Sequence, residues 1–234
     1  MSATSAGSAR SPVRTAVLFS AGLDSAVLLA QAAADGEQPQ PVYVRTGLAW
    51  EADERTSASR IVDTLALSYA IRPMVTLTVD MRDVYPAAHW AVRGDAPGFD
   101  TPDSDVYLEG RNVILLSKAS VYMAREKLAR VLIGPLAGNP FPDASRQFFD
   151  AMQRAVSIGL GTPIIIDAPF SGMRKADVIR LGVSLGVPFE LTLSCMQPMN
   201  GRHCGRCSKC RERRDAFNDA RVSDPTVYAV EPPR

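Results

Sequence analysis

Long apolar runs are missing from this 234-residue sequence. None approaches the roughly 20 residues that a transmembrane helix needs, and no signal peptide is visible. An excess of charge is missing too, because 26 lysines and arginines offset 25 aspartates and glutamates and leave a net charge of +1. Such a chain sets up no strong field to attract nucleic acid. We therefore expect a cytoplasmic protein without a membrane partner, and the charge balance argues against a nucleic-acid partner.

Cysteine is absent before position 195. The four cysteines share one spacing, C-x8-C-x2-C-x2-C: Cys195, Cys204, Cys207 and Cys210. Since none is left for a core, where free thiols commonly sit, the four are expected to act together. Four thiolates suit the closed tetrahedral shell of a structural zinc ion, and the short C-x2-C steps around Gly205 are typical of knuckle loops. An iron–sulfur cluster and two disulfides are the alternatives, although nothing marks the chain as secreted.

Histidine is equally scarce, with only His89 and His203. His203 precedes Cys204 and competes as a ligand, but four thiolates already complete a zinc shell. His89 stands beside Trp90 and is expected to pack rather than to catalyse. The basic run at residues 202–214 has no interleaved aromatic residues for stacking on bases, so it is interpreted as a solvated face.

Short apolar runs alternate with helical patterns along the chain, and 46% of the residues are apolar, enough for a large core. Strands are expected at residues 14–19, 42–44, 74–79, 131–133 and 163–166. Helices are expected at residues 24–34, 51–67, 112–128, 145–160 and 174–185. Unbroken apolar strands indicate a sheet covered on both faces. The alternation predicts an α/β fold with an open, doubly wound parallel sheet of the Rossmann-like kind.

Ligands of such sheets bind beyond the carboxyl ends of the strands. The loops expected to meet there are residues 20–25, 45–51, 136–146 and 168–175. Residues 93–110 are rich in Gly, Pro and Asp and are interpreted as a long ordered loop or a lid over the site.

Residues 20–25 (SAGLDS), directly after the first expected strand, carry the strongest chemical signal. Ala21 and Gly22 are small enough for backbone amides to approach a phosphate, and the next helix presents its positive N-terminus. Ser20 and Ser25 add hydroxyl donors, and Asp24 stands where a magnesium ion is held beside phosphate oxygens. The pattern is not a Walker A loop. The ordinary alternative is a strand-to-helix turn with Ser20 or Asp24 as the N-cap.

This loop resembles the SGGxDS pyrophosphatase loop (PP-loop) of the adenine-nucleotide alpha hydrolase superfamily. The C-terminal part is similar to the end of the 7-cyano-7-deazaguanine synthase family, the nitrile-forming enzymes of queuosine biosynthesis. That similarity rests on Ser194-Cys195, Cys204-Gly205-x-Cys207-x-x-Cys210, Arg213 and Ala216-Phe217. Two further parts of the chain match the family: Gly110-Arg111-Asn112, and Lys175-Ala176-Asp177 through Leu191-Thr192. All matches keep their order from about Val13 to Phe217.

The resemblance implies an ATP-dependent ligase that forms a carbon–nitrogen bond at a carboxylate through an acyl-adenylate. In the family, 7-carboxy-7-deazaguanine and ammonia give the nitrile, with AMP and pyrophosphate as products. ATP, Mg²⁺ and Zn²⁺ are the implied cofactors. The residues implied in ATP binding are Ser20, Ala21, Gly22, Leu23, Asp24, Ser25, Val44, Arg45 and Thr46. Asp24, Arg111 and Lys175 are the candidates for catalysis, and Asn112, Asp143 and Arg146 those for binding the substrate.

The implied division of the chain has four parts. Residues 1–12 are expected to be a disordered tail, 13–190 the PP-loop ATP-binding α/β domain, 191–221 a zinc-binding segment, and 222–234 a proline-containing tail, either a strap or a frayed end. Apolar helix faces are compatible with a homodimer.

The sequence also departs from the family. Ala21 replaces a glycine, which is expected to be tolerable only if this residue keeps a negative φ. After the second strand, Tyr-Gly-Gln and a histidine are replaced by Thr46-Gly47-Leu48 with no histidine, Glu109 replaces a proline, and residues 141–146 lack the family's cysteine. A divergent enzyme acting on another carboxylate or conjugating a deazaguanine, a tRNA-thiolating enzyme, and a non-catalytic nucleotide-binding module therefore remain alternatives. Lys175 and Arg111 are the candidates for stabilising phosphate charge in the transition state, while Asn112 alternatively caps its helix.

Overall fold

The computed structural model describes residues 14–233, so the tail predicted at residues 1–12 lies outside the described residues. Five parallel strands form one sheet in the order β3-β2-β1-β4-β5. Their bounds are β1 Thr15–Leu18, β2 Gln40–Arg45, β3 Val75–Thr78, β4 Arg130–Leu132 and β5 Ile165–Asp167. Strands β1 and β4 are neighbours from which the chain continues in opposite directions, which is the topological switch point where doubly wound sheets bind ligands. The predicted fold class is confirmed.

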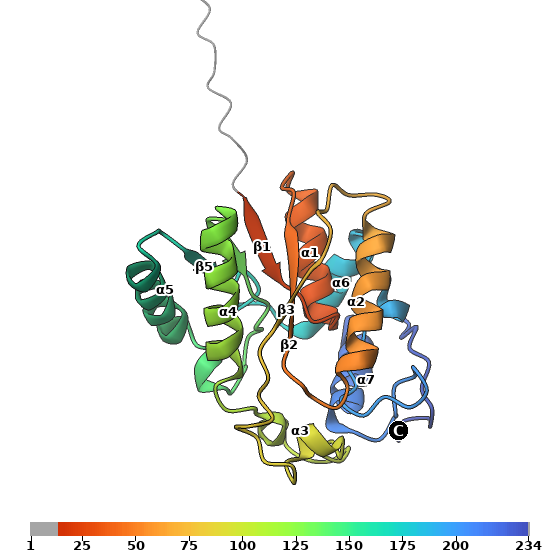
Figure 1. Cartoon of the computed structure of the whole chain (residues 1–234). Helices are drawn as coiled ribbons and strands as arrows, with labels where there is room; N and C mark the ends of the chain where they lie inside the picture. Colours follow the sequence, from red (N-terminus) through yellow and green to blue (C-terminus); the bar gives the residue numbers. More distant parts are fainter. Residues whose placement is uncertain (1–13, 234) are drawn as a thin grey trace, which may run out of the picture.

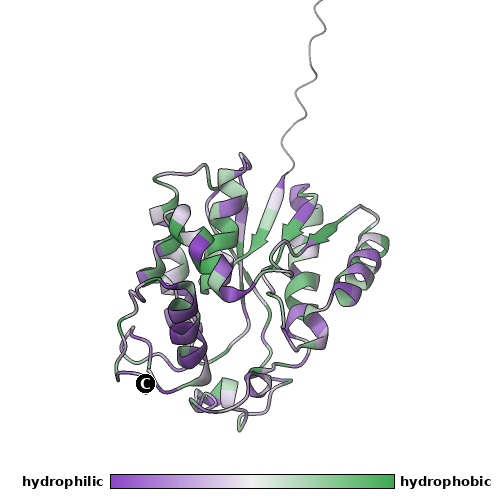
Figure 2. Cartoon of the chain, turned by 180° about the vertical axis from the view of Figure 1, so that it is seen from behind, coloured by the Kyte–Doolittle hydropathy of each residue, from purple (hydrophilic) through white to green (hydrophobic). Residues whose placement is uncertain are grey.

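Helices cover both faces of the sheet, as Figure 1 shows. One face carries α1 (Leu23–Ala34), α2 (Glu51–Leu65), α6 (Lys175–Ser184) and α7 (Ser208–Ala220). The other carries α4 (Arg111–Glu126) and α5 (Arg146–Leu160). The alternation of side chains along β1 serves both cores, since Val17 packs on the first face and Ala16 and Leu18 on the second. In Figure 2 the strands are apolar and hydrophilic residues gather on the helices.

The segment between β3 and α4 is ordered and closes one end of the molecule. It contains the short helix α3 (Trp90–Arg93) and a 3₁₀ turn at Asp103–Val106. His89 caps α3 by accepting the Ala91 N–H and stacks on Tyr85, which is the packing role expected of it. No helix within residues 14–233 has the length and apolar composition required to span a bilayer.

The C-terminal part differs most from the sequence-based expectations. Helix α7 was not predicted, and the solvated basic face expected at residues 202–214 is wrong for Arg211 and Arg213 near the end of that run. Arg213 is only 1% exposed. Arg211 donates to the carbonyls of Phe99 and Thr101, so it ties α7 to the 93–110 loop. Arg211 and Arg213 of α7 therefore make contacts between segments instead of forming a solvated face.

The proline-containing tail folds back as a strap. The His203 N–H donates to Val227 O, and the Ala229 N–H donates to His203 O. A Cβ at Gly205, whose φ is +77°, would lie 1.7 Å from Val230 O. This close approach explains why glycine is needed at the turn between Cys204 and Cys207.

Candidate active site and cysteine cluster

The turn after β1 has the geometry of an anion-binding loop. Gly22 is the N-cap of α1 with φ −64° and ψ 156°, and no side chain caps this helix. The alternative in which Ser20 or Asp24 caps α1 is therefore wrong. The Ser25 hydroxyl instead closes the loop, because it donates to Gly22 O (3.0 Å) and accepts the Ser20 N–H (3.3 Å). An uncapped N-terminus leaves backbone N–H groups for a phosphate oxygen.

Ala21 does not keep the negative φ that the sequence analysis required. Its φ is +57°, and the residue is fully buried. A left-handed conformation costs an L-residue roughly 1–2 kcal/mol, so other contacts must hold it. One of them is visible: the Leu193 N–H donates to Ala21 O at 2.9 Å.

A cavity of about 270 Å³ opens from this loop. Its lining comes from the carboxyl ends of β1, β2 and β4, from the start of α4, and from the 93–110 loop. Of the predicted site residues, those in its wall are Ser20, Gly22, Asp24, Ser25, Val44, Arg111, Asn112 and Asp143. Tyr107 and Phe141, stacked with their ring centroids 5.0 Å apart, line the same cavity.

Other predicted residues lie elsewhere. Ala21 and Leu23 belong to the core beneath the loop. The Arg45 side chain pairs with Glu51, and the Thr46 N–H donates to that same carboxylate. Arg146 is 87% exposed at its side chain and pairs with Asp150, one turn further along α5. The structure thus does not bring Arg146 to the cavity, because at the start of α5 it faces solvent.

The substrate loop and α4 are joined through Asp143. Its carboxylate accepts the Asn112 backbone N–H at 2.9 Å, while the Asn112 side chain donates to Asp143 O at 3.0 Å. Asp143 thereby satisfies a free amide in the first turn of α4. Burial raises the pKa of Asp143, and the hydrogen bond from Asn112 opposes this shift.

Lys175 reaches Asp24 from α6. Its Nζ lies 3.4 Å from Asp24 Oδ2 and also pairs with Glu212 of α7. Glu212 in turn accepts from Lys209, which lines the cavity and was not foreseen from the sequence. Burial raises the pKa of Asp24 despite the attraction of Lys175. Burial opposes the charge of Lys175, but Asp24 and Glu212 outweigh it and raise the pKa of Lys175.

We expect Glu212→Gln to weaken the fold in a pH-dependent way. Burial opposes the charge of Glu212, but Lys175 and Lys209 outweigh it and lower its pKa below the usual 4.5. A lowered carboxyl pKa stabilises the fold above the usual value, and this contribution is lost as the pH falls below it. The variant should therefore melt below the wild type at pH 7, with a difference that shrinks below about pH 4.5. Melting curves of the variant and the wild type at pH 7 and at a pH below 4.5 test this prediction. Asp219→Asn, an exposed position on the same helix, is the control and should melt like the wild type at both pH values. A difference that does not depend on pH would contradict the prediction.

A second polar group in the cavity was missed by the sequence analysis. The Tyr43 hydroxyl donates to Glu54 Oε2 at 2.8 Å, and both Glu54 and Arg111 line the cavity. Burial raises the pKa of Glu54, although Arg111 attracts its charged form. Among the described residues, Arg111 Nε is buried without a hydrogen-bond acceptor. The only sequence signal was a glutamate one helical turn into α2.

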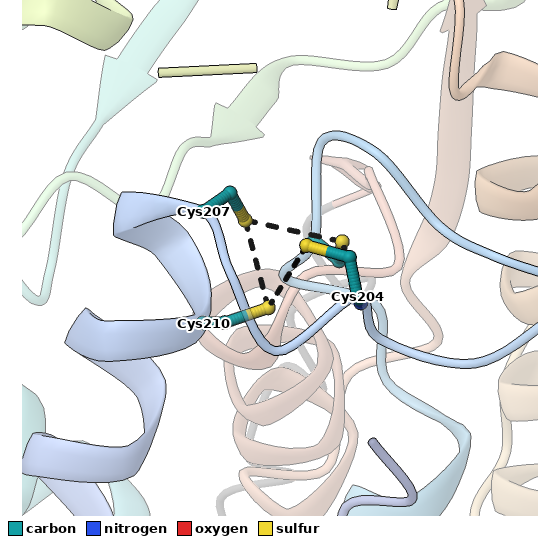
Figure 3. A group of neighbouring side chains, drawn as sticks. Cys204, Cys207 and Cys210 are labelled. Atoms are coloured by element: carbon teal, nitrogen blue, oxygen red, sulfur yellow. Dashed lines mark hydrogen bonds between the residues drawn. The ribbon is translucent and has the colours of Figure 1, made fainter. Parts of the chain in front are cut away.

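The four cysteines lie together at the start of α7, and Figure 3 labels Cys204, Cys207 and Cys210. Their sulfur atoms are all within 4.8 Å of one another, with recorded pairs at 3.5, 3.8 and 3.9 Å. A tetrahedron with Zn–S bonds of about 2.3 Å has S···S edges of about 3.8 Å, so the set fits a tetrahedral metal shell. All four are free thiols, which contradicts the disulfide alternative.

Backbone amides support this cluster. The N–H groups of Gln197 and Cys204 point at Cys195 Sγ (both 3.3 Å), and those of Gly205 and Arg206 point at the sulfurs of Cys210 and Cys204 (both 3.4 Å). Such donors stabilise thiolates that bind a metal. His203 is not part of the set, because its Nε2 accepts the Ser194 N–H at 3.0 Å. The cluster can bind a metal through its thiolates alone.

Taken together, the parallel sheet, the uncapped loop after β1 and the cysteine cluster define an α/β protein of the PP-loop class with a four-cysteine knuckle. The model of the family described as queuosine biosynthesis protein QueC matches residues 14–221, and the chain belongs to that family.

Curated relatives cover nearly the whole chain and carry one name, 7-cyano-7-deazaguanine synthase. That of Anaeromyxobacter dehalogenans is 34% identical over 92% of this chain and 96% of the relative. The Myxococcus xanthus relative is 35% identical over 92% of this chain and 97% of its own length. The Methanoculleus marisnigri relative is 33% identical over 90% of this chain and 96% of its own length. These relatives are enzymes with small-molecule substrates. A solved structure of a predicted tRNA methyltransferase subunit from Methanocaldococcus jannaschii covers 94% of this chain at 14% identity and a TM-score of 0.48, too weak a likeness to carry an argument.

Proposed function

We propose that this protein is an ATP-dependent carbon–nitrogen ligase that converts 7-carboxy-7-deazaguanine and ammonia into 7-cyano-7-deazaguanine, with release of AMP and pyrophosphate. The observation that carries the proposal is one cavity that joins the uncapped loop after β1 to Arg111, Asn112 and Asp143. The names of the curated relatives support the same product, 7-cyano-7-deazaguanine.

The chemistry requires two activations. The substrate carboxylate attacks the α-phosphorus of ATP and expels pyrophosphate; ammonia then displaces AMP and leaves the amide. The amide oxygen attacks a second ATP in the same way, and loss of AMP with a proton leaves the nitrile. Pyrophosphate is the leaving group of both activations, so the groups that stabilise its charge set the rate.

The phosphate end of the cavity is suited to that charge. Gly22 brings the start of α1 to the cavity with no competing side-chain cap, and Ser20 contributes a hydroxyl to its wall. Lys175 and Lys209 place two ammonium groups beside Asp24 and the cavity wall. Their mutual repulsion is offset by Glu212, which lies between them.

Asp24 is the residue that fits a magnesium ion. Its Oδ1 is buried and has no hydrogen-bond partner among the described residues, while Oδ2 faces Lys175. A free carboxylate oxygen beside a phosphate loop is the ligand that Mg²⁺ prefers. The ion would neutralise charge that develops on the phosphate oxygens.

The adenine is expected beside β2. Val42 O accepts the Phe19 N–H at the end of β1. Backbone groups of a strand point to the same neighbour at every second residue, so those of Val44 also point toward β1, but beyond its last residue. Val44 also lines the cavity. The backbone of Arg45 points to β3, since its carbonyl accepts the Val79 N–H. The Thr46 N–H already donates to the Glu51 carboxylate. We therefore keep Val44, and not Arg45 or Thr46, as the adenine contact.

The opposite end suits a flat heterocycle. Tyr107 and Phe141 offer aromatic faces, and Asp143 and Glu54 offer carboxylates to the donor edge of a guanine-like base. Arg111 lines the same cavity, and we propose that it binds the substrate carboxylate or the adenylate. We further propose a zinc ion on the four cysteines, free ammonia as co-substrate, a cytoplasmic location and a homodimer.

Mass spectrometry tests the substrate. With ATP, magnesium and ¹⁵N-ammonium, we expect 7-carboxy-7-deazaguanine to give a nitrile that carries one ¹⁵N atom. A product formed only from another acid in a panel of carboxylates would favour the divergent enzyme. ATP binding without any product would favour the non-catalytic module, and either result would overturn the proposal.

A further inference from the structure

Ala21 is held in a conformation that its own side chain disfavours, in the loop proposed to bind ATP. Its φ is +57°, whereas Gly22 next to it adopts an extended conformation that any residue tolerates. The amide that accompanies this conformation belongs to Leu193, which donates to Ala21 O at 2.9 Å. The position of the loop therefore depends on a residue far away in the sequence.

Both neighbours of Leu193 are fixed by one buried side chain. Arg213 Nη1 donates to Thr192 Oγ1 at 2.7 Å and to Ser194 Oγ at 3.2 Å. Its Nη2 donates to Phe189 O at 2.8 Å, so three residues of one segment share the guanidinium. The planar fork of arginine makes such a set of fixed directions possible, and lysine cannot reproduce it.

The other side of Arg213 is attached to the strap. Its Nε donates to Thr226 Oγ1 and lies 3.6 Å from Asp224 Oδ1, and its guanidinium lies 5.1 Å from the centre of the Phe217 ring. Arg213 is thus bound mainly to neutral oxygens although it is only 1% exposed. Burying a cation with one distant carboxylate is costly, and burial lowers the pKa of Arg213. Its contacts converge on the segment that carries the Leu193 amide.

We infer that Arg213 is a positioning residue for the phosphate loop: it fixes residues 189–194 so that the Leu193 N–H holds Ala21 in its left-handed conformation. This inference rests on the proposed function, since it assigns the loop to ATP. It makes the C-terminal segment part of the nucleotide site without any contact to the nucleotide. Replacement of Ala21 by glycine removes the need for the support, because glycine adopts positive φ without strain.

The test compares Arg213→Lys with Arg213→Lys combined with Ala21→Gly. The exposed Arg202→Lys in the same segment is the matched control. Two quantities are measured at a temperature where all variants are folded: hydrogen exchange of the 19–25 peptide, and the Kd for magnesium–ATP. We expect Arg213→Lys to speed exchange of that peptide and to raise the Kd about tenfold. Ala21→Gly should recover most of the lost affinity, and Arg202→Lys should change neither quantity.

Thr192→Val is the second test variant, for the case that Arg213→Lys does not fold. It leaves Arg213 in place and keeps the shape of the side chain at position 192. It removes one acceptor of Arg213 and should shift both quantities in the same direction by less. If exchange of the 19–25 peptide and the Kd stay at wild-type values in a destabilised Arg213→Lys protein, the residue is merely structural and the inference is wrong. Failure of Ala21→Gly to restore affinity would also overturn it. If the wild type itself does not bind magnesium–ATP, the proposed function fails, whereas faster exchange of the loop would still show the support.

Discussion

Replacement of Asp24 by asparagine is expected to abolish ATP turnover and to leave the fold intact. The amide keeps the size of the side chain but offers no second anionic oxygen for magnesium, and Lys175 loses one of its two partners. Removal of a single charge-stabilising group from such a site typically costs a factor of about 10²–10³ in rate. Release of AMP under saturating ATP measures this loss.

The stability of this variant gives the control. Because burial raises the pKa of Asp24, its ionised form disfavours folding once the pH exceeds the usual value of 3.8. Asparagine removes this cost, but it also removes one of the two carboxylates that favour the charge of Lys175, so the melting temperature at pH 7 should stay near that of the wild type. Asp35→Asn, at the exposed end of the same helix, should leave both turnover and melting near the wild type. A fully active Asp24→Asn enzyme would remove Asp24 from the mechanism.

Cys207→Ser is expected to produce the largest loss of stability. The side chain is 2% exposed, and its sulfur lies 3.5 Å from Cys210 Sγ and 3.9 Å from Cys195 Sγ. A structural zinc ion contributes about 10 kcal/mol or more in small zinc peptides. Loss of about 5 kcal/mol would lower the Tm of a chain of this size by about 10–20 °C. Solubility should fall with it.

Metal analysis and melting curves check this second prediction together. The wild type should contain about one zinc ion per chain, consistent with a four-thiolate shell, and a chelator should lower its Tm as the substitution does. Iron with a visible charge-transfer band would favour the cluster alternative. A soluble, metal-free Cys207→Ser protein with unchanged melting would contradict a folding role for the metal.

The sheet and the phosphate loop were predictable because their signals are local. Continuous apolar runs such as residues 131–133 indicate strands buried on both faces, and the structure places them at β1 to β5 with shifts of a few residues. Small residues and hydroxyls directly after β1 predicted a loop at the carboxyl edge of the sheet, where the structure places the cavity. The grouping of the cysteines followed from their spacing alone.

The errors have a common physical cause, which is contact between distant segments. From the sequence, Ala21 was expected to have a negative φ, whereas its φ is +57° and the distant Leu193 N–H donates to its carbonyl. From the sequence, Arg213 was expected to be a surface cation, whereas residues 189–194 and the strap surround it in the structure. Arg146 was a candidate from a loop that departs from the family pattern, and it lies at the start of α5 on the solvent side. Lys209 enters the cavity only because α7 packs against α6.

The most direct test of the account is the identity of the nucleotide product. Phosphorus NMR of a reaction that contains the wild-type protein, magnesium, ATP, ammonium and 7-carboxy-7-deazaguanine separates the two possible cleavages. Binding of the triphosphate by the loop after β1, with attack at the α-phosphorus, predicts AMP and pyrophosphate in equal amounts. ADP with inorganic phosphate, or unchanged ATP, would contradict it.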